Sequence, residues 1–421
     1  MLKRVHIKGY KSLLDVEAYI EPLTVLFGPN AAGKSNVLDA LQLLSRLGTS
    51  KTLKDAFDAP YRGKPLESFT MREGGLKELR AREHLTFSFE ADLRLSDAVV
   101  HAVNQEIRDM RRPSGAVSPP ENGKERLPQV HERDLRYRIE IEMLPGSGIL
   151  RVADESLAAL NRKGNPTGKR KPFFGREGER IHLRLDGQAH PTYYDRYLDR
   201  SILSMPHYLP YYPHVAAARR ELESWRFFCF DPRERMRTAA PLREVSHIGP
   251  MGEDLAAFLN TLKATDPDRL QDMEKALHAL LPDIDGIDVQ VNEFGEAELC
   301  LIEGSAAMSA RMLSDGTLRM LGLLALIGAR EAPGLVGLEE PENGIHPRHI
   351  QCIADLLKTQ QALQQTQCIV TTHSPLLSDV LPDESLFAVS RSGGATRIDT
   401  FSTWGTLGRG RDIDRVLSDE Y

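Results

Sequence analysis

The chain has 421 residues, of which 41% are hydrophobic and 27% are charged, and its formal net charge at pH 7 is −6. This length predicts two or three domains around a large core, and the composition is that of an ordinary soluble globular protein. The acidic balance argues against a generally basic protein that coats nucleic acid, although local basic patches remain possible.

The cysteines and the N-terminus indicate the compartment. Four cysteines stand far apart, with no CxxC pair and no histidines at zinc spacing, which indicates buried thiols in a reducing compartment. They are Cys229, Cys300, Cys352 and Cys368. The start MLKRVHIKGYKSL is charged and strand-like rather than a signal peptide, and no apolar run approaches the roughly 20 residues of a membrane span. We therefore expect a cytoplasmic protein.

Residues 1–95 are predicted to alternate strand and helix. Short strands are expected at 5–7, 14–20 and 22–27, and a helix whose apolar residues recur at helical spacing follows as far as Leu47. From 85 to 93 apolar and polar residues alternate, which predicts a half-buried strand.

The most informative motif lies between the third strand and this helix. The run GPNAAGKS at 28–35 matches the phosphate-binding pattern G-x-x-x-x-G-K-[ST], in which backbone N–H groups and a helix N-terminus surround a polyphosphate. Lys34 is predicted to reach the β- and γ-phosphates, and the Ser35 hydroxyl to ligate Mg²⁺. An ordinary glycine turn before a helix is the alternative. The predicted nucleotide-binding residues are Gly28, Pro29, Asn30, Ala31, Ala32, Gly33, Lys34, Ser35 and Asn36.

Residues 96–230 are predicted to form an inserted β-rich or mixed subdomain. The stretch 111–127 is rich in Pro, Gly and charge, which indicates a linker or surface loop, and a strand with one wet face follows at 137–143. The segment 161–180 is basic and contains Phe173 and Phe174. Cations for phosphates beside aromatic rings for bases indicate a nucleic-acid patch, with a solvated hairpin as the alternative.

From residue 251 the helical period returns, and a strand pair is expected at 287–291 and 297–302. No sustained heptad pattern lies between Lys34 and Leu313, and prolines interrupt the interval, which argues against a long coiled-coil arm.

Two carboxylates follow the apolar run LVGL at 335–338. At the tip of a strand beside the phosphate loop, Glu339 can hold Mg²⁺ and Glu340 can polarise the attacking water as a general base. Many strands end in solvated acids, and this is the alternative.

Two further motifs flank these acids. In LSDGT at 313–317, Ser314 is a natural N-cap, Asp315 opens the helix, and Gly316 lets a phosphate approach the backbone. The strand 368–372 leads into His373, which can donate to a γ-phosphate and sense its presence. The alternative for His373 is a satisfied polar residue before a helix.

The order GPNAAGKSN, LSDGT, LEEPENGIHP, TTHSP resembles the ATP-binding-cassette type of ATPase, and more narrowly the bacterial OLD/RecF/SMC-like ATPases of the AAA family, type 21. The resemblance covers the chain except for 96–230. It implies an α/β fold: a P-loop NTPase head of the ABC type, with a mixed β-sheet flanked by helices, an inserted subdomain and a helical lobe. The segments expected are 1–95 (head with Walker A), 96–230 (insertion), 231–310 (helical and β lobe), 311–395 (remainder of the head) and 396–421 (tail).

The resemblance also assigns roles. It implies Walker A at 28–35, the signature at Ser314, Asp315 and Gly316, Walker B ending in Glu339, Glu340 as catalytic base, and His373 as switch histidine. ATP and Mg²⁺ are the implied cofactors. Two heads are implied to sandwich ATP, so that the signature of one copy completes the pocket of the other.

Three positions depart from the family pattern or stay open. The first Walker B acid is commonly Asp, so the directness of the Mg²⁺ contact of Glu339 is in doubt. The Q-loop glutamine is not identifiable, and 67–75 is the segment where it is expected. Lys11 resembles a position at which related ATPases place a basic residue near the nucleotide, and a solvated strand-end lysine is the equal alternative.

Three functions remain open. The first is an ATPase whose separate nuclease or other effector acts in a DNA-associated or anti-phage system. Only 48 residues follow His373, so a nuclease is expected in trans, and the tail 408–421 could dock it or form a frayed helix. The second is a RecF-like DNA repair or maintenance ATPase. The third, a transporter ATPase subunit, is disfavoured by the large insertion and the GTLRML continuation.

Overall fold

The computed structural model describes residues 1–71, 74–110, 129–167, 171–184, 192–195, 197–329, 332–363, 366–401 and 409–418. Its internal contacts divide the chain into two compact units, each built from separate stretches. The first unit comprises Met1–Glu21, Asn36–Trp225 and Arg391–Asp399, and the second comprises Pro22–Ser35, Arg226–Ser390 and Thr400–Tyr421.

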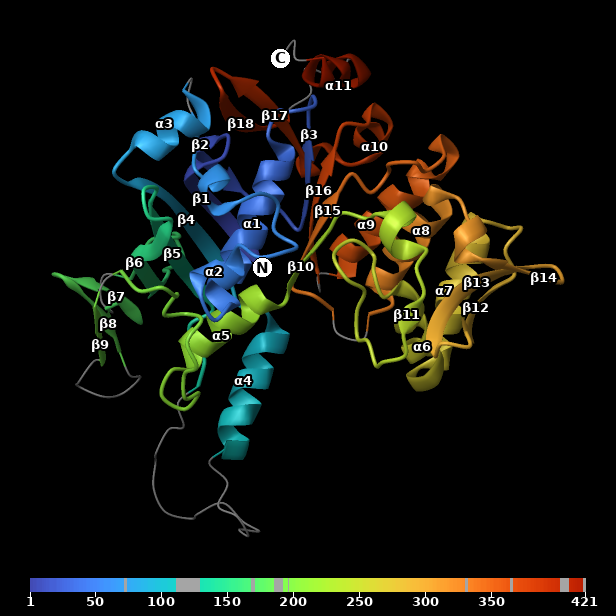
Figure 1. The fold of residues 1–421 in the computed structure, drawn as a ribbon, viewed down its shortest axis with the longest axis horizontal. Helices are drawn as coiled ribbons and strands as arrows, with labels where there is room; N and C mark the ends of the chain where they lie inside the picture. The colour runs from blue at the N-terminus through green and yellow to red at the C-terminus, as the bar shows by residue number, and fades with distance from the viewer. Residues whose placement is uncertain are drawn as a thin grey trace, which may run out of the picture. The chain divides into compact units, whose positions relative to one another are not determined.

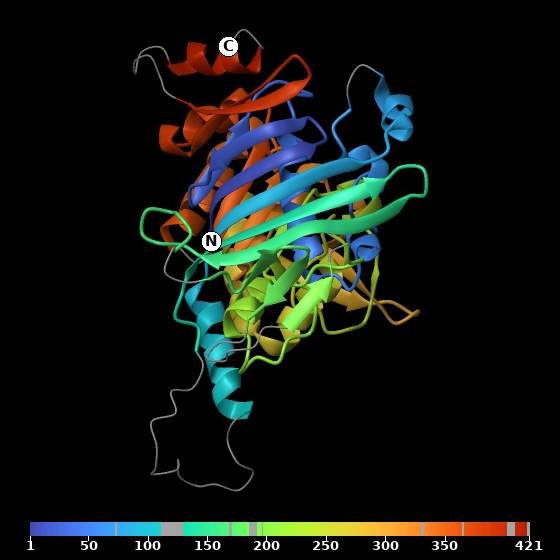
Figure 2. The same ribbon diagram turned by 90° about the vertical axis from the view of Figure 1, so that its left-hand side faces the viewer.

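The first unit contains one long antiparallel sheet (Figure 2), with the order β2-β1-β4-β5-β6-β7-β8-β9. The strands are β1 (Leu2–Tyr10), β2 (Leu13–Tyr19), β4 (Leu85–Arg94), β5 (Asp134–Leu144), β6 (Ile149–Ala159), β7 (Phe174–Glu177), β8 (Arg180–Leu183) and β9 (Thr192–Asp195). Alternation of apolar and polar residues sets the register, because it buries one face of each strand. Phe89, for example, lies opposite Ile7 on one neighbour and Ile139 on the other.

Helices, short turns of helix and one further strand complete this unit. They are α1 (Lys34–Thr49, whose first two residues belong to the second unit), α2 (Leu53–Ala56), η1 (Pro65–Ser68), α3 (Gly75–Ala81), α4 (Asp97–Met110), α5 (Pro213–Glu223) and most of β18 (Ala395–Thr400). Glu155 is fully buried and accepts hydrogen bonds from the Tyr137 and Ser201 hydroxyls and the N–H groups of Ile202 and Leu203. The carboxyl of Glu155 therefore ties β6 to β5 and to the segment before α5.

The second unit contains strands in the order β10-β15-β16-β3-β17, of which β15, β16, β3 and β17 are parallel to one another (Figure 1). They are β3 (Leu23–Phe27), β10 (Trp225–Phe228), β15 (Leu335–Glu339), β16 (Gln367–Thr372) and β17 (Leu386–Ser392). Strands β3, β15 and β16 are near-continuous apolar runs, as expected of parallel strands buried on both faces. In the parallel register Phe27 lies opposite Thr372, and Thr371 lies opposite Glu339. The carboxyl ends of these three strands therefore meet at one edge.

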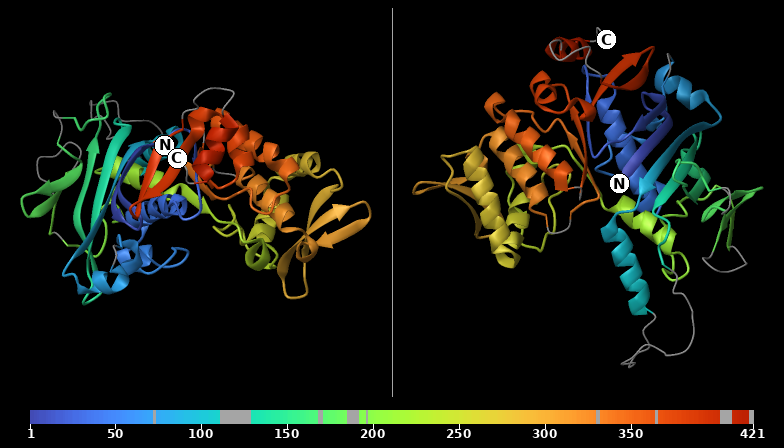
Figure 3. Two further views of the ribbon diagram at one scale, coloured as in Figure 1. Left: turned by 90° about the horizontal axis from the view of Figure 1, so that it is seen from above. Right: turned by 180° about the vertical axis from the view of Figure 1, so that it is seen from behind.

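Helices and a smaller sheet complete the second unit. Helices α6 and α7 pack on the antiparallel pair β12–β13 and on α8 (Figure 3). The elements are η2 (Pro232–Met236, a π-helix), β11 (Ala240–Pro241), α6 (Leu255–Thr265), α7 (Pro267–Leu280), β12 (Gly286–Val291), β13 (Glu296–Glu303), β14 (Ala306–Ser309), η3 (Ala310–Met312), α8 (Asp315–Ile327), η4 (Pro347–His349), α9 (Ile350–Leu363), α10 (Pro375–Val380), η5 (Asp383–Ser385) and α11 (Arg409–Leu417).

The structure confirms the predicted strands and helices around the four motifs, but it groups them differently from the five expected segments. Strand β3 pairs with β16 and β17, while β4 pairs with β5, so that residues 134–159 extend the sheet of the N-terminal strands. The linker 111–127 lies outside the described residues. None of the described helices is long and apolar enough to cross a membrane.

Two smaller expectations are corrected. Cys229 is exposed rather than buried, whereas Cys300 and Cys368 are buried as expected. In the tail, α11 packs on α10 and buries Ile413 and Val416, so the described part of this helix is anchored rather than frayed.

Candidate nucleotide site

The phosphate loop begins where β3 ends. A Cβ on Gly28 would lie 2.1 Å from the backbone oxygen of Val389 in β17, so only glycine fits at this position. The Lys34 ammonium donates to the carbonyl oxygens of Gly28 at 2.8 Å and Pro29 at 2.9 Å, and the side chain is buried. The lysine is therefore folded across its own loop.

The charge of Lys34 is balanced by acids. Burial lowers the pKa of Lys34, and the charges of Glu340, Glu342 and Glu339 work in the opposite direction. Three carboxylates thus act on a single ammonium.

The two predicted Mg²⁺ ligands contact each other directly. The Ser35 hydroxyl, in the first turn of α1, donates to Oε1 of Glu339 at the tip of β15, with 2.5 Å between the oxygens. A hydroxyl and a carboxylate are the oxygen ligands that Mg²⁺ takes beside phosphate and water. These residues therefore fit a magnesium ion, and the longer Glu339 side chain reaches Ser35 in place of the usual Asp.

Glu340 is held in an unusual backbone conformation next to His373. Its φ is +44°, which is uncommon for a residue with a side chain, and its N–H donates to the Thr371 oxygen at 2.9 Å. Oε1 of Glu340 lies 3.1 Å from Nδ1 of His373, without the angles of a hydrogen bond. Oε2 accepts from the Asn343 amide at 2.9 Å. Strained backbone at such a site is typical of functional residues.

Sequence reasoning missed two residues here, Asn343 and Glu342. Asn343 orients the carboxylate of Glu340, and its position three residues later in the motif was the available signal. Glu342 is buried, and its Oε1 accepts from the Thr372 hydroxyl. Its Oε2 has no hydrogen-bond partner among the described residues. Burial raises the pKa of Glu342.

Replacing Glu342 with glutamine is expected to stabilise the protein more at pH 8 than at pH 5. Folding raises the pKa of Glu342, so the neutral carboxyl stabilises the folded state below the pKa of an unfolded Glu, which is about 4.3. This contribution to the free energy of unfolding is lost as the pH rises through the pKa that Glu342 has in the folded protein. Glutamine does not ionise. Melting temperatures of Glu342→Gln and the parent at both pH values test this, with exposed Glu293→Gln as control. An equal difference at both pH values would contradict the expectation.

The signature turn is exposed at its serine and packed at its glycine. Ser314 caps α8, because its hydroxyl accepts from the Thr317 N–H at 3.1 Å. A Cβ on Gly316 would lie 2.6 Å from the Gly344 oxygen, so the turn packs on the segment after the Walker B acids. This packing explains the glycine without a phosphate, and the phosphate contact of Gly316 stays a prediction.

Two other residues predicted near the nucleotide, Lys11 and Asn36, contact other side chains. The Lys11 ammonium pairs with Asp39 at 2.6 Å, and Arg62 binds the same carboxylate at 2.8 Å. The Asn36 amide donates to the Ser12 hydroxyl at 2.7 Å. These contacts lie within the first unit. The proposed roles of Lys11 and Asn36 near the nucleotide stay predictions.

The two aromatic side chains of the basic segment 161–180 do not lie on the surface. Phe173 and Phe174 are buried, and Phe173 stacks on His214 with ring centroids 4.4 Å apart. Neither ring is therefore available to stack on a base. Lys169 and Arg170 lie outside the described residues.

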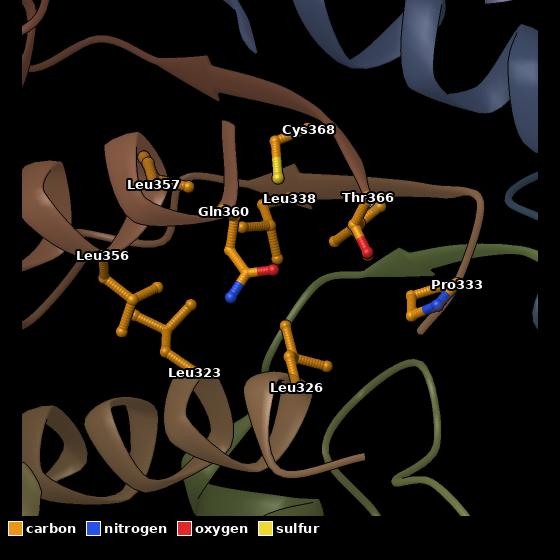
Figure 4. A pocket seen from close by; sticks show the side chains of 10 residues that line it. Leu323, Leu326, Pro333, Leu338, Leu356, Leu357, Gln360, Thr366 and Cys368 are labelled. Atoms are coloured by element: carbon orange, nitrogen blue, oxygen red, sulfur yellow. The ribbon is translucent and has the colours of Figure 1, made fainter. Parts of the chain in front are cut away.

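A small apolar cavity lies behind the Walker B strand (Figure 4). It measures about 30 Å³ and is lined by side chains of α8, α9, β15 and β16 together with the turns that lead into the strands. Its lining residues are Leu323, Leu326, Pro333, Val336, Leu338, Leu356, Leu357, Gln360, Thr366 and Cys368. Burial raises the pKa of Cys368 to about 12. Without charged groups, this cavity is unsuited to a nucleotide.

Comparisons with known proteins identify the family of the chain. The family model described as "AAA domain, putative AbiEii toxin, Type IV TA system" matches residues 23–100 and 230–379, more than half of the chain. The chain is 30% identical over 105 residues to the DNA replication and repair protein RecF of Synechocystis, a quarter of each protein. It is 43% identical over 44 residues to the OLD nuclease of Thermus scotoductus, 10% of this chain and 8% of that protein. The matched segments thus span a quarter or less of these relatives.

Among solved structures, an SMC head bound to the C-terminal winged-helix domain of ScpA has a similar fold. The match has a TM-score of 0.51 and 12% identity, and it covers 95% of this chain and 98% of that one. Such low identity shows the fold alone. Together with the phosphate loop and the family match, it establishes an ABC-type P-loop head. The chain belongs to the AAA family whose model it matches, and over part of its length it is similar to proteins of the RecF and OLD type.

Proposed function

We propose that this protein binds ATP with Mg²⁺, pairs head to head with a second copy around the nucleotide, and hydrolyses ATP slowly. The observation that carries the proposal is the meeting of Lys34, Ser35, Glu339, Glu340 and His373 at the carboxyl edge of β3, β15 and β16. Parallel α/β sheets bind their ligands at this edge. Ser314 is exposed, which suits a contact with a second protein surface.

In this proposal the residues of the loop hold the triphosphate. Lys34 leaves the carbonyl oxygens of Gly28 and Pro29 and binds the β- and γ-phosphates. Ser35 and Glu339 would hold Mg²⁺, which supplies charge neutralisation when bound. Backbone N–H groups of the loop orient the phosphates.

Glu340 then accepts a proton from the attacking water. Asn343 fixes one oxygen of its carboxylate, which leaves the oxygen near His373 to face the water. His373 can donate to the γ-phosphate and so reports whether it is present. A positioned base of this kind contributes roughly 10²- to 10⁴-fold to a rate.

Ser314→Arg is expected to leave ATP binding by one copy intact but to abolish ATP-dependent pairing and hydrolysis. The arginine would fill the exposed position that has to close on the γ-phosphate of the other copy. Equilibrium binding of a fluorescent ATP analogue, light scattering with ATP, and phosphate release measure the three properties. Ser305→Arg, on the exposed turn after β13, is the matched control. Hydrolysis at the parental rate in Ser314→Arg would rule out the sandwich.

We further propose that ATP-dependent pairing of the two copies serves a DNA-associated process. A nuclease or another effector of an anti-phage system would be a separate partner. The similarity to an OLD nuclease supports this role. An autonomous DNA maintenance ATPase is the second candidate, and the similarity to RecF supports it. Stimulation of ATP hydrolysis by duplex DNA in the purified protein favours the second candidate. Hydrolysis that responds only to a copurified nuclease favours the first.

A further inference from the structure

Asp315, the second residue of the signature turn, is held by two arginines from a distant part of the chain. Nη2 of Arg237 lies 2.8 Å from Oδ1 of Asp315, and Nε of Arg233 lies 3.0 Å from Oδ2. Arg237 also donates to the Leu313 oxygen at 2.7 Å. It therefore connects the residue before Ser314 with the residue after it, and the backbone of the turn is fixed on both sides of the serine.

The acid creates an electrostatic problem for the proposed phosphate contact. The N-terminus of α8 favours an anion, because its first N–H groups have no partner within the helix and its dipole is positive there. Asp315 already places one negative charge in this turn, and it would repel an incoming phosphate. Two guanidinium groups on one carboxylate reverse the local charge from negative to positive.

The arginines are carried by a well-anchored element. The π-helix η2 is capped by the Asp231 carboxylate, which accepts from the Glu234 N–H at 3.1 Å. Met236 is buried, and a Cβ on Gly322 of α8 would lie 2.9 Å from its terminal methyl group. Because η2 packs this closely on α8, the arginines are presented to the signature turn in a fixed geometry.

We propose that Arg233 and Arg237 are positioning residues of the signature turn, which neutralise Asp315 and hold it aside so that the turn can receive a γ-phosphate bound by a second copy. This inference rests on the proposed pairing around ATP. Arg237, with a quarter of its side chain exposed, fixes the turn. Arg233 is 78% exposed and acts mainly through its charge.

A double-mutant cycle between Arg233 and Asp315 tests the charge function, because Arg233 is too exposed for its replacement to disturb the fold. In the parent, Arg233→Met is expected to lower kcat by about tenfold. In a chain that already carries Asp315→Asn, the same change should lower kcat by less than about twofold. The affinity of one copy for a fluorescent ATP analogue should stay unchanged, so the loss appears in kcat rather than in binding. Arg235→Met, on the same π-helix and without an ion pair among the described residues, is the control.

Ser314→Arg measured in parallel separates the two claims. If Ser314→Arg is inactive but Arg233→Met turns over ATP at the parental rate, the pairing stands and the positioning role is wrong. If Arg233→Met lowers kcat equally in the parent and in Asp315→Asn, the positioning role is also wrong, because the arginine would then act independently of the acid. Parental activity in Ser314→Arg refutes the pairing itself.

Discussion

Replacing Glu340 with glutamine is expected to lower ATP turnover by at least about 10²-fold while ATP binding is retained. Glutamine keeps the size of the side chain and an oxygen that can accept from the Asn343 amide, but it cannot take a proton from water. The variant should therefore accumulate as an ATP-bound pair. Phosphate release measures turnover, and binding of a fluorescent ATP analogue measures retention.

The control for this variant is Glu303→Gln, an exposed acid at the end of β13 in the same unit. It makes the same chemical change away from the strand edge and should leave turnover at the parental rate. Turnover of Glu340→Gln within a few fold of the parent would reassign the base. Glu342 would be a poor replacement, because its side chain is buried and its carboxylate already accepts from the Thr372 hydroxyl.

Replacing Lys34 with alanine is expected to weaken ATP binding by at least about thirtyfold, which corresponds to the loss of one charged contact of about 2 kcal/mol or more. Lys34 is the cation of the loop, and it is buried where the phosphates are proposed to lie. Isothermal titration with ATP and Mg²⁺ measures the change.

Lys54→Ala in the exposed helix α2 is the matched control and should bind ATP like the parent. The melting temperature of Lys34→Ala should change little, because the variant removes a buried charge together with its two contacts to carbonyl oxygens. Parental affinity in Lys34→Ala would place the nucleotide elsewhere.

The nucleotide site could largely be predicted because its signals are local. A buried apolar strand, a glycine loop with Lys34, and a helix with apolar periodicity follow one another between Leu23 and Thr49, and the structure forms β3 and α1 there. The same holds for β15 before Glu339 and β16 before His373, since continuous apolar runs predict parallel strands.

What could not be predicted depends on contacts between residues far apart in the sequence. Arg233 and Arg237 precede Asp315 by about eighty residues, and no local pattern joins them. The close packing of Gly316 on Gly344 is likewise a contact that the local motif does not reveal. Phe173, placed by its basic neighbours in a surface patch, is buried because it stacks on His214.

We propose that ATP joins two copies of this protein through their signature turns. The most direct test is the mass in solution of Glu340→Gln with saturating ATP and Mg²⁺, measured by multi-angle light scattering. The mass should double on addition of ATP, and adding Ser314→Arg to the same chain should return the mass to its value without ATP. An unchanged mass at full occupancy of the nucleotide site would rule out pairing around ATP.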